Sequence, residues 1–127
     1  GHIYRAALEG VACSLWQNVR LMEDAGLPVA AVTAVGGGTK NPAWMQITAD
    51  VSGKRILVPA VTVGASYGDA LMAAVGTGRL SGFAELKSVI RPGRVYTPDP
   101  AAHERYGVLR EVYTALYPAT RELMHRL

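Results

Sequence analysis

Apolar residues in the first part of the chain recur every three or four positions. They stand at Tyr4, Ala7, Leu8, Val11, Ala12, Leu15, Trp16, Val19 and Met22. An α-helix has 3.6 residues per turn, so this spacing places them on one helical face. Gly26 and Pro28 follow, and both residue types commonly end helices. The pattern predicts an amphipathic helix from Tyr4 to Asp24.

The pattern then changes to short uninterrupted apolar runs. Val29 to Val35 contains three valines and ends on glycines, which is typical of a buried strand. Arg55 to Val58 is a second run of this kind and stops at Pro59. A helix is expected between the two strands, so they should pair in parallel.

Three more helical stretches are predicted after the first strand. One runs from Pro42 to Val51, with Asn41 as its N-cap and a proline in its first turn. An alanine-rich helix follows from about Ser66 to Val75. Apolar residues at helical spacing in Ala101 to Leu127 predict a helical tail, and Pro118 is a point where it could bend.

The segment from Phe83 to Pro100 is predicted to be a loop with an extended piece over Val89 to Tyr96, because prolines punctuate it. The order helix, strand, helix, strand, helix, helix is that of an α/β fold. Two strands make a poor sheet, since an independent sheet usually needs three or more strands or a covering layer. We therefore expect the 127 residues to be one partial domain of a longer protein that supplies further strands.

Composition and charge exclude several classes of protein. The net charge of +3 comes from 13 basic and 10 acidic residues, and no Lys/Arg block is dense enough to predict nucleic-acid binding. No stretch approaches the roughly 20 apolar residues that span a bilayer. Cys13 has no partner for a disulfide, which favours a reducing compartment and a core position. We expect a cytoplasmic protein that binds neither nucleic acid nor membrane.

Three glycines, Gly36 to Gly38, separate the first strand from the helix that begins near Asn41. A helix N-terminus presents free N–H groups and a partial positive charge that suit an anion such as phosphate. Glycine also lets a bulky ligand lie against the main chain. The letters GGGTKN fit neither the Walker loop nor the dinucleotide fingerprint. A nucleotide is the obvious ligand, and glycines that merely turn the chain are the alternative.

A longer string strengthens the nucleotide interpretation. "VGGGTKNPAWMQITADVSGKRILVP", followed by "GASYGDALMAAVGTG", resembles the C-terminal ATP-binding domain of FGGY-family carbohydrate kinases, most closely the xylulokinase-like members. The opening "YRAALEGVACSLWQNVRLMEDAG" resembles the helix before the glycine motif in that family. The resemblance covers about Tyr4 to Gly78. It implies part of an actin-like, ribonuclease-H-like ATPase fold, with a short, mostly parallel sheet flanked by helices.

The resemblance also implies roles for individual residues. Gly37 and Gly38 match glycines that lie against the phosphate and ribose side of the nucleotide, and Asn41 matches a position that contacts the base. Lys40 points either into solvent or toward phosphate. The family's catalytic aspartate and sugar-binding residues lie upstream of the glycine motif, so we assign no catalytic residue to this chain.

The implied activity is transfer of the γ-phosphoryl group of ATP, with Mg²⁺, to a sugar hydroxyl, and D-xylulose or a related pentulose is the expected sugar. The sugar would be bound mainly by the missing N-terminal portion, so the fragment alone should be inactive. The alternative is a non-catalytic nucleotide-binding or interaction module of the actin-like fold. The tail over 101–127 could dock on its own domain, which we prefer, or on a second subunit of a homodimer.

The sequence departs from the commoner family pattern at the third predicted helix. Many members carry a glutamate before a Gly-Ala-Ala, whereas Val63-Gly64 and Gly68-Asp69-Ala70 stand here. Asp69 is interpreted as a favourable charge near a helix N-terminus, with a water-mediated metal contact as the alternative. The other conspicuous residues are expected to be structural: Trp16 and Trp44 in the core, Asp50 as a hydrogen-bond acceptor, and His2, His103 and His125 without metal.

Overall fold

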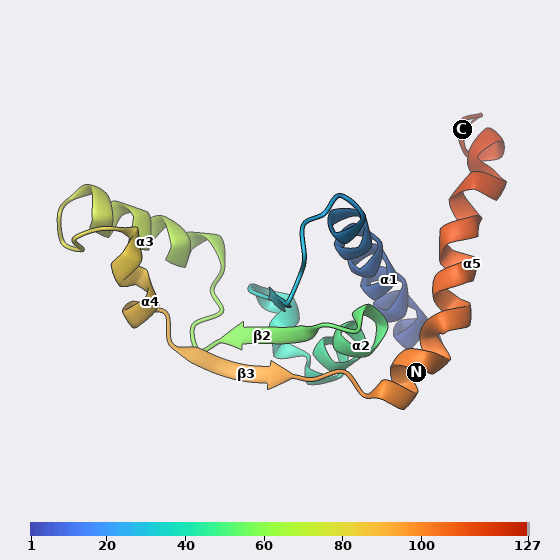
Figure 1. Cartoon of the computed structure of the whole chain (residues 1–127), viewed down its shortest axis with the longest axis horizontal. Coiled ribbons are helices and arrows are strands. Elements are labelled where there is room, and N and C mark those ends of the chain that lie inside the picture. The colour runs from blue at the N-terminus through green and yellow to red at the C-terminus, as the bar shows by residue number, and fades with distance from the viewer. Residues whose placement is uncertain (127) are drawn as a thin grey trace.

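The computed structural model describes residues 1 to 126, shown in Figure 1. Its elements are α1 (His2–Asp24), β1 (Ala31–Thr33), the 3-10 helix η1 (Gly37–Lys40), α2 (Pro42–Ser52), β2 (Arg55–Pro59), α3 (Ala65–Gly76), the 3-10 helix η2 (Phe83–Glu85), α4 (Leu86–Val89), β3 (Pro92–Tyr96) and α5 (Pro100–Met124). The predicted α/β class is confirmed, whereas the predicted order of elements lacked α4 and β3. None of the described helices is both long enough and apolar enough to cross a membrane.

The sheet has three strands in the order β1-β2-β3. β1 runs parallel to β2, with Val32 opposite Ile56. β3 runs antiparallel to β2, with Ile56 opposite Tyr96. The extended piece predicted over Val89 to Tyr96 is the paired strand β3, but the first part of the predicted loop is helical, as η2 and α4. The sheet consists of one parallel and one antiparallel pair.

α2 lies between α1 and the sheet and is buried on both sides. Toward α1 it contributes Ile47 and Val51 to one apolar cluster, and toward β2 it contributes Met45 and Ala49 to a second. A helix buried on two sides has no wide polar face, which explains why seven of its eleven residues, from Met45 to Ser52, are buried. The core of the described chain is centred on this helix.

Both ends of α2 have side-chain or glycine caps. Asn41 is the predicted N-cap, and its side-chain oxygen accepts a hydrogen bond from Trp44 N at 3.2 Å. At the other end Gly53 adopts φ 67°, the left-handed conformation that commonly follows a helix. The His103 ring packs on this glycine, since an added Cβ would lie 2.7 Å from its Cε1 atom.

The first half of α5 docks on the domain that precedes it, as preferred for the predicted tail. Tyr106, Leu109 and Tyr113 pack against the cluster formed by α1 and α2. The Tyr106 hydroxyl donates to Glu9 Oε1 at 2.8 Å and accepts from Arg5 Nη2 at 3.0 Å. Burial is the main cause that raises the pKa of Tyr106. The helix continues through Pro118 to Met124.

The segment that contains α3 and α4 forms a separate lobe, at the left of Figure 1, attached at the ends of β2 and β3. No residue of α3 or α4 is buried. Large apolar side chains are exposed there, including Val63, Met72 and Phe83. The described structure exposes 8883 Å², whereas a compact monomer of this mass would expose about 6,500 Å².

Candidate functional site

Two glycine-bearing loops meet at the carboxyl ends of the parallel strands β1 and β2. Gly36 N donates a hydrogen bond to Thr62 O at 2.8 Å. Gly64 lies against the same residue, because a Cβ added there would be 3.6 Å from Gly36 Cα. Both glycines have positive φ, 91° and 79°, a conformation that other residues rarely adopt. In open α/β sheets ligands bind in the crevice at this edge, so this is the candidate site.

Gly37 presents its main chain to open space. The residue is exposed, and an added Cβ would meet nothing within 4 Å. The loop around it is held in place from within, since buried Thr39 donates from its hydroxyl to Gly36 O at 2.7 Å. A ligand could therefore approach Gly37 closely without displacing any described side chain.

Gly38 lacks a side chain for a different reason. An added Cβ would lie 2.7 Å from Cζ3 and 3.2 Å from Cε3 of Trp44. That ring belongs to the core, where it packs against both apolar clusters. The core position predicted for Trp44 is confirmed, although its buried Nε1 has no hydrogen-bond partner. In this structure the close neighbour of Gly38 is the protein's own indole.

Asn41 is engaged at both ends of its amide. Its Oδ1 accepts from Trp44 N at 3.2 Å as the cap of α2, and its Nδ2 donates to the Tyr4 hydroxyl at 3.2 Å. An amide oxygen has two lone pairs and an amide nitrogen has two hydrogens. One acceptor position and one donor position of Asn41 therefore remain available for a ligand.

The charged groups beside the glycine loops are cationic. Lys40 and Arg94 both line a cavity of about 270 Å³ together with Thr39 and Thr62. Among residues 1 to 126, neither cation forms an ion pair. Their positive charge favours an anionic ligand near this edge of the sheet.

The N-terminus of α3 completes the second loop. Gly64 is its N-cap and no side chain caps the helix, so the first-turn N–H groups lack a side-chain acceptor. Asp69 is exposed and lies in the second turn, one residue beyond the positions where the helix dipole acts most strongly. Within the described residues no group of three or more potential metal ligands occurs.

The remaining residues singled out in the sequence have structural surroundings. Asp50 accepts hydrogen bonds from Gln46 Nε2 at 2.8 Å and Asp99 N at 2.9 Å, so the predicted structural hydrogen-bonding role is confirmed. Cys13 is fully buried, and burial raises the pKa of its thiol, which makes it a poor nucleophile. Trp16 is partly buried against the core.

Sequence reasoning missed the contact between Gly36 and Gly64. A signal for it was available, because Gly64 follows the second strand much as Gly36 follows the first. Parallel neighbouring strands bring their carboxyl ends together, so two glycines in such positions are expected to face one another.

The fold and the crevice define an α/β domain of the class that binds ligands at the carboxyl ends of its parallel strands. Residues 1–77 match the C-terminal domain of the FGGY family of carbohydrate kinases. The chain belongs to this family, and its fold is part of the actin-like ATPase fold.

Individual relatives agree with this assignment. The chain is 32% identical to a xylulose kinase of Bacillus subtilis over 96% of its own length and 25% of the relative. It is 35% identical to an autoinducer-2 kinase of Escherichia coli over 91% of its length and 22% of the relative. The crystal structure of xylulose kinase from Rhodospirillum rubrum superposes with a TM-score of 0.81 and 35% identity, covering 98% of this chain and 26% of that one. The chain thus spans about a quarter of the length of these proteins.

Proposed function

We propose that this chain is the nucleotide-binding C-terminal domain, residues 1–127 with a helical tail over 101–127, of a sugar kinase. The complete enzyme transfers the γ-phosphoryl group of ATP to a sugar hydroxyl. Family membership supports the reaction class. The observation that carries the proposal is the meeting of the Gly36 and Gly64 backbones beside the open main chain of Gly37.

The residues present suit a nucleotide. The open backbone at Gly37 accommodates a bulky group, and the uncapped first turn of α3 offers N–H donors to an anion. Asn41 has one donor and one acceptor position free for a base. The absence of a side chain at Gly38 lets the Trp44 ring pack against the loop. When bound, ATP supplies the transferable phosphoryl group and Mg²⁺ neutralises its charge. No catalytic or metal-ligating residue is assigned to this chain.

D-Xylulose or a related pentulose is the proposed sugar, because several relatives are named as xylulose kinases. The autoinducer-2 kinase is similar to the same degree, so the choice rests on the remainder of the enzyme. Comparison of kcat/KM for D-xylulose with that for other phosphoryl acceptors, using the full-length protein, tests the choice. A preference for a substrate other than a pentulose would contradict it. A cytoplasmic location belongs to the same proposal, in keeping with the unpaired Cys13.

An ADP titration followed by amide NMR tests the nucleotide site in this chain. Shifts are expected at Gly37, Gly38 and Asn41, and Gly37→Val should abolish them, because its side chain fills the open space in front of the loop. Gly76→Val is the matched control, since Gly76 ends α3 and an added Cβ also meets nothing within 4 Å there.

The decisive form of the test uses the full-length enzyme. Gly37→Val is expected to raise KM for ATP about tenfold or more with little change in KM for the sugar, because it removes binding on the nucleotide side only. The isolated chain should show no turnover with any sugar. If Gly37→Val left KM for ATP unchanged, the glycine loop would not be the nucleotide site.

A further inference from the structure

A second cavity lies between α1 and α5, apart from the glycine loops. Figure 1 shows these helices diverging from the N-terminal end of α1. The space between them is about 600 Å³ and is lined by Trp16, Arg20, Arg110 and Glu111 among others. Its size falls within the range of small-molecule sites, about 300–1,000 Å³. None of its lining residues takes part in the glycine crevice.

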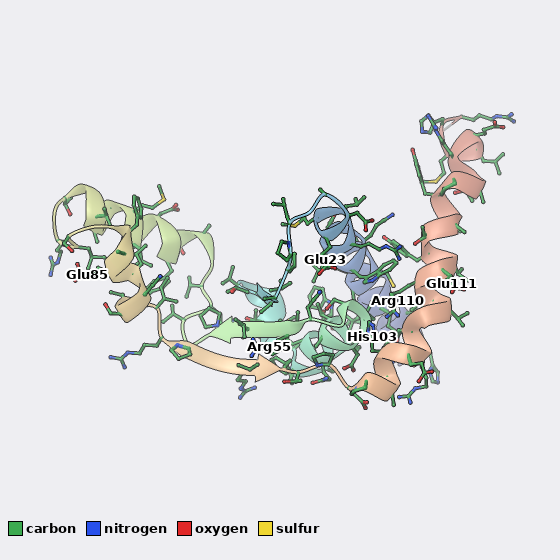
Figure 2. The ribbon with its side chains drawn as sticks, viewed as in Figure 1. Glu23, Arg55, Glu85, His103, Arg110 and Glu111 are labelled. Atoms are coloured by element: carbon green, nitrogen blue, oxygen red, sulfur yellow. The ribbon has the colours of Figure 1, made fainter. Side chains whose placement is uncertain are left out.

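Arg110 is a partly buried cation with unused donors. Its Nη1 donates to Val51 O at 3.0 Å and to His103 O at 3.1 Å, and it lies 3.1 Å from His103 Nδ1. These contacts use one nitrogen, so Nη2 and Nε remain available. No carboxylate within residues 1–126 forms an ion pair with it. Burial lowers the pKa of Arg110, which reflects the cost of holding this charge without a counter-ion. Figure 2 shows Arg110 between α1 and α5.

Arg20 brings a second positive charge to the same cavity. Its only described ion pair is with Asp24 at 3.8 Å, and both side chains are about two-thirds exposed, so the pair neutralises the charge weakly. The guanidinium carbons of Arg20 and Arg110 lie 5.9 Å and 5.6 Å from the centroid of the Trp16 ring. The indole attracts each cation, and both positive charges attract an anion that enters the cavity.

We propose that the cavity between α1 and α5 binds the phosphate group of a small ligand, held by Arg110 and Arg20 beside Trp16. A guanidinium presents a planar fork of N–H donors that matches phosphate oxygens. The cavity is larger than a phosphate ion alone, so it also accommodates the organic part of a phosphomonoester such as a sugar phosphate. The carboxylate of Glu111 repels an anion, because it lowers the net charge of the lining from +2 to +1.

The test follows the indole N–H signal of Trp16 by NMR, with the Trp44 indole as an internal reference. Inorganic phosphate and ribose 5-phosphate are the two probes, added at constant ionic strength, with ribose as the uncharged control. A saturable shift of Trp16 with a Kd in the millimolar range or below is expected for ribose 5-phosphate. Tighter binding of ribose 5-phosphate than of phosphate identifies a phosphomonoester site, and equal Kd values identify a phosphate ion site.

Charge variants separate a built site from general attraction. Arg110→Gln and Arg20→Gln should each raise Kd about tenfold, because each removes charge-assisted hydrogen bonds. Glu111→Gln should lower Kd. Arg121→Gln, which removes the same charge from an exposed position in the last turn of α5, should leave Kd unchanged. Arg20→Gln keeps the test valid if loss of the Arg110 contacts unfolds the chain.

Two results would overturn the proposal: no saturable shift of Trp16 with either probe, or equal weakening by Arg121→Gln and Arg20→Gln. The Gly37→Val variant should bind both probes as the unmodified chain does. Failure of phosphate binding in the cavity can therefore be told apart from failure of nucleotide binding at the glycine loops.

Discussion

Gly37 and Gly38 are neighbours in one short helix but lack side chains for different reasons. Gly37 faces open space, while Gly38 faces the Trp44 ring. A substitution at Gly37 therefore acts on whatever approaches from outside. A substitution at Gly38 acts on the packing of the core.

Gly38→Ala should lower the free energy of unfolding by about 1–3 kcal/mol, because the new methyl group overpacks the site against the indole. Gly37→Ala should change it by no more than about 0.5 kcal/mol. Urea denaturation followed by circular dichroism measures both values. Trp44→Phe removes the atoms that the methyl group would meet, so the double variant should be more stable than the sum of the single effects predicts. Equal effects at the two glycines would contradict this distinction.

The sequence predicted that close approach explains these glycines, but it could not tell which neighbour approaches. At Gly38 the neighbour is Trp44, six positions along the chain, and only the turn between η1 and α2 brings the two together. The nucleotide roles of Gly37, Gly38 and Asn41 stay predictions. The cap role of Asn41 could be predicted from the sequence, because it depends on residues within one helical turn.

At the level of elements, the cap of α2 links the candidate site to the core. Asn41→Ala should lower the free energy of unfolding by about 1 kcal/mol, since it removes the acceptor for Trp44 N. Asn41→Asp keeps that acceptor and should cost much less, although it removes the Nδ2 donor that bonds the Tyr4 hydroxyl. Thermal unfolding of the two variants compares them, and an equal loss in both would show that the bond to Tyr4 matters more.

An ion pair ties the end of α1 to the residue before β2. Lys54 Nζ lies 2.5 Å from Glu23 Oε1, and this hydrogen bond is the main cause that lowers the pKa of Glu23 below its ordinary value of 4.5. A depressed carboxyl pKa stabilises the folded state above the unfolded pKa, and the benefit disappears as pH falls through the folded pKa. The loss of stability caused by Lys54→Met should therefore be smaller at about pH 3 than at neutral pH. Urea midpoints at the two pH values measure this, and a constant difference would contradict it.

Local elements were predictable and non-local pairing was not. α2 and α3 begin and end within one residue of their predicted bounds, because caps, prolines and glycines mark them. β3 was predicted only as an extended piece, since its sequence PGRVY contains a proline and an arginine and its partner β2 lies far along the chain. Gly93 is the overlooked sign of that pairing, because an added Cβ would collide with the main chain at Val58 and Pro59.

At the level of the whole molecule, the lobe of α3 and α4 should be the least protected part. It contains no buried residue, whereas α2 is buried on two sides. Amide hydrogens in α3 should therefore exchange with solvent at least about tenfold faster than those in α2, because local opening of α3 exposes little new apolar surface. Hydrogen exchange read by NMR measures this difference in the isolated chain, and equal protection of the two helices would contradict it.

The lobe joins the rest of the structure at a narrow neck, where Ala60 N donates to Arg91 O at 3.1 Å next to the ends of β2 and β3. Mechanically, α3 is a lever about 18 Å long whose fulcrum lies beside the glycine loops. A rotation of about 10° at the neck would carry the far end of α3 through about 3 Å. The same rotation would move Gly64 much less, because displacement grows with distance from the fulcrum. Such a rotation would displace the distant tip of the lobe and leave the crevice nearly unchanged.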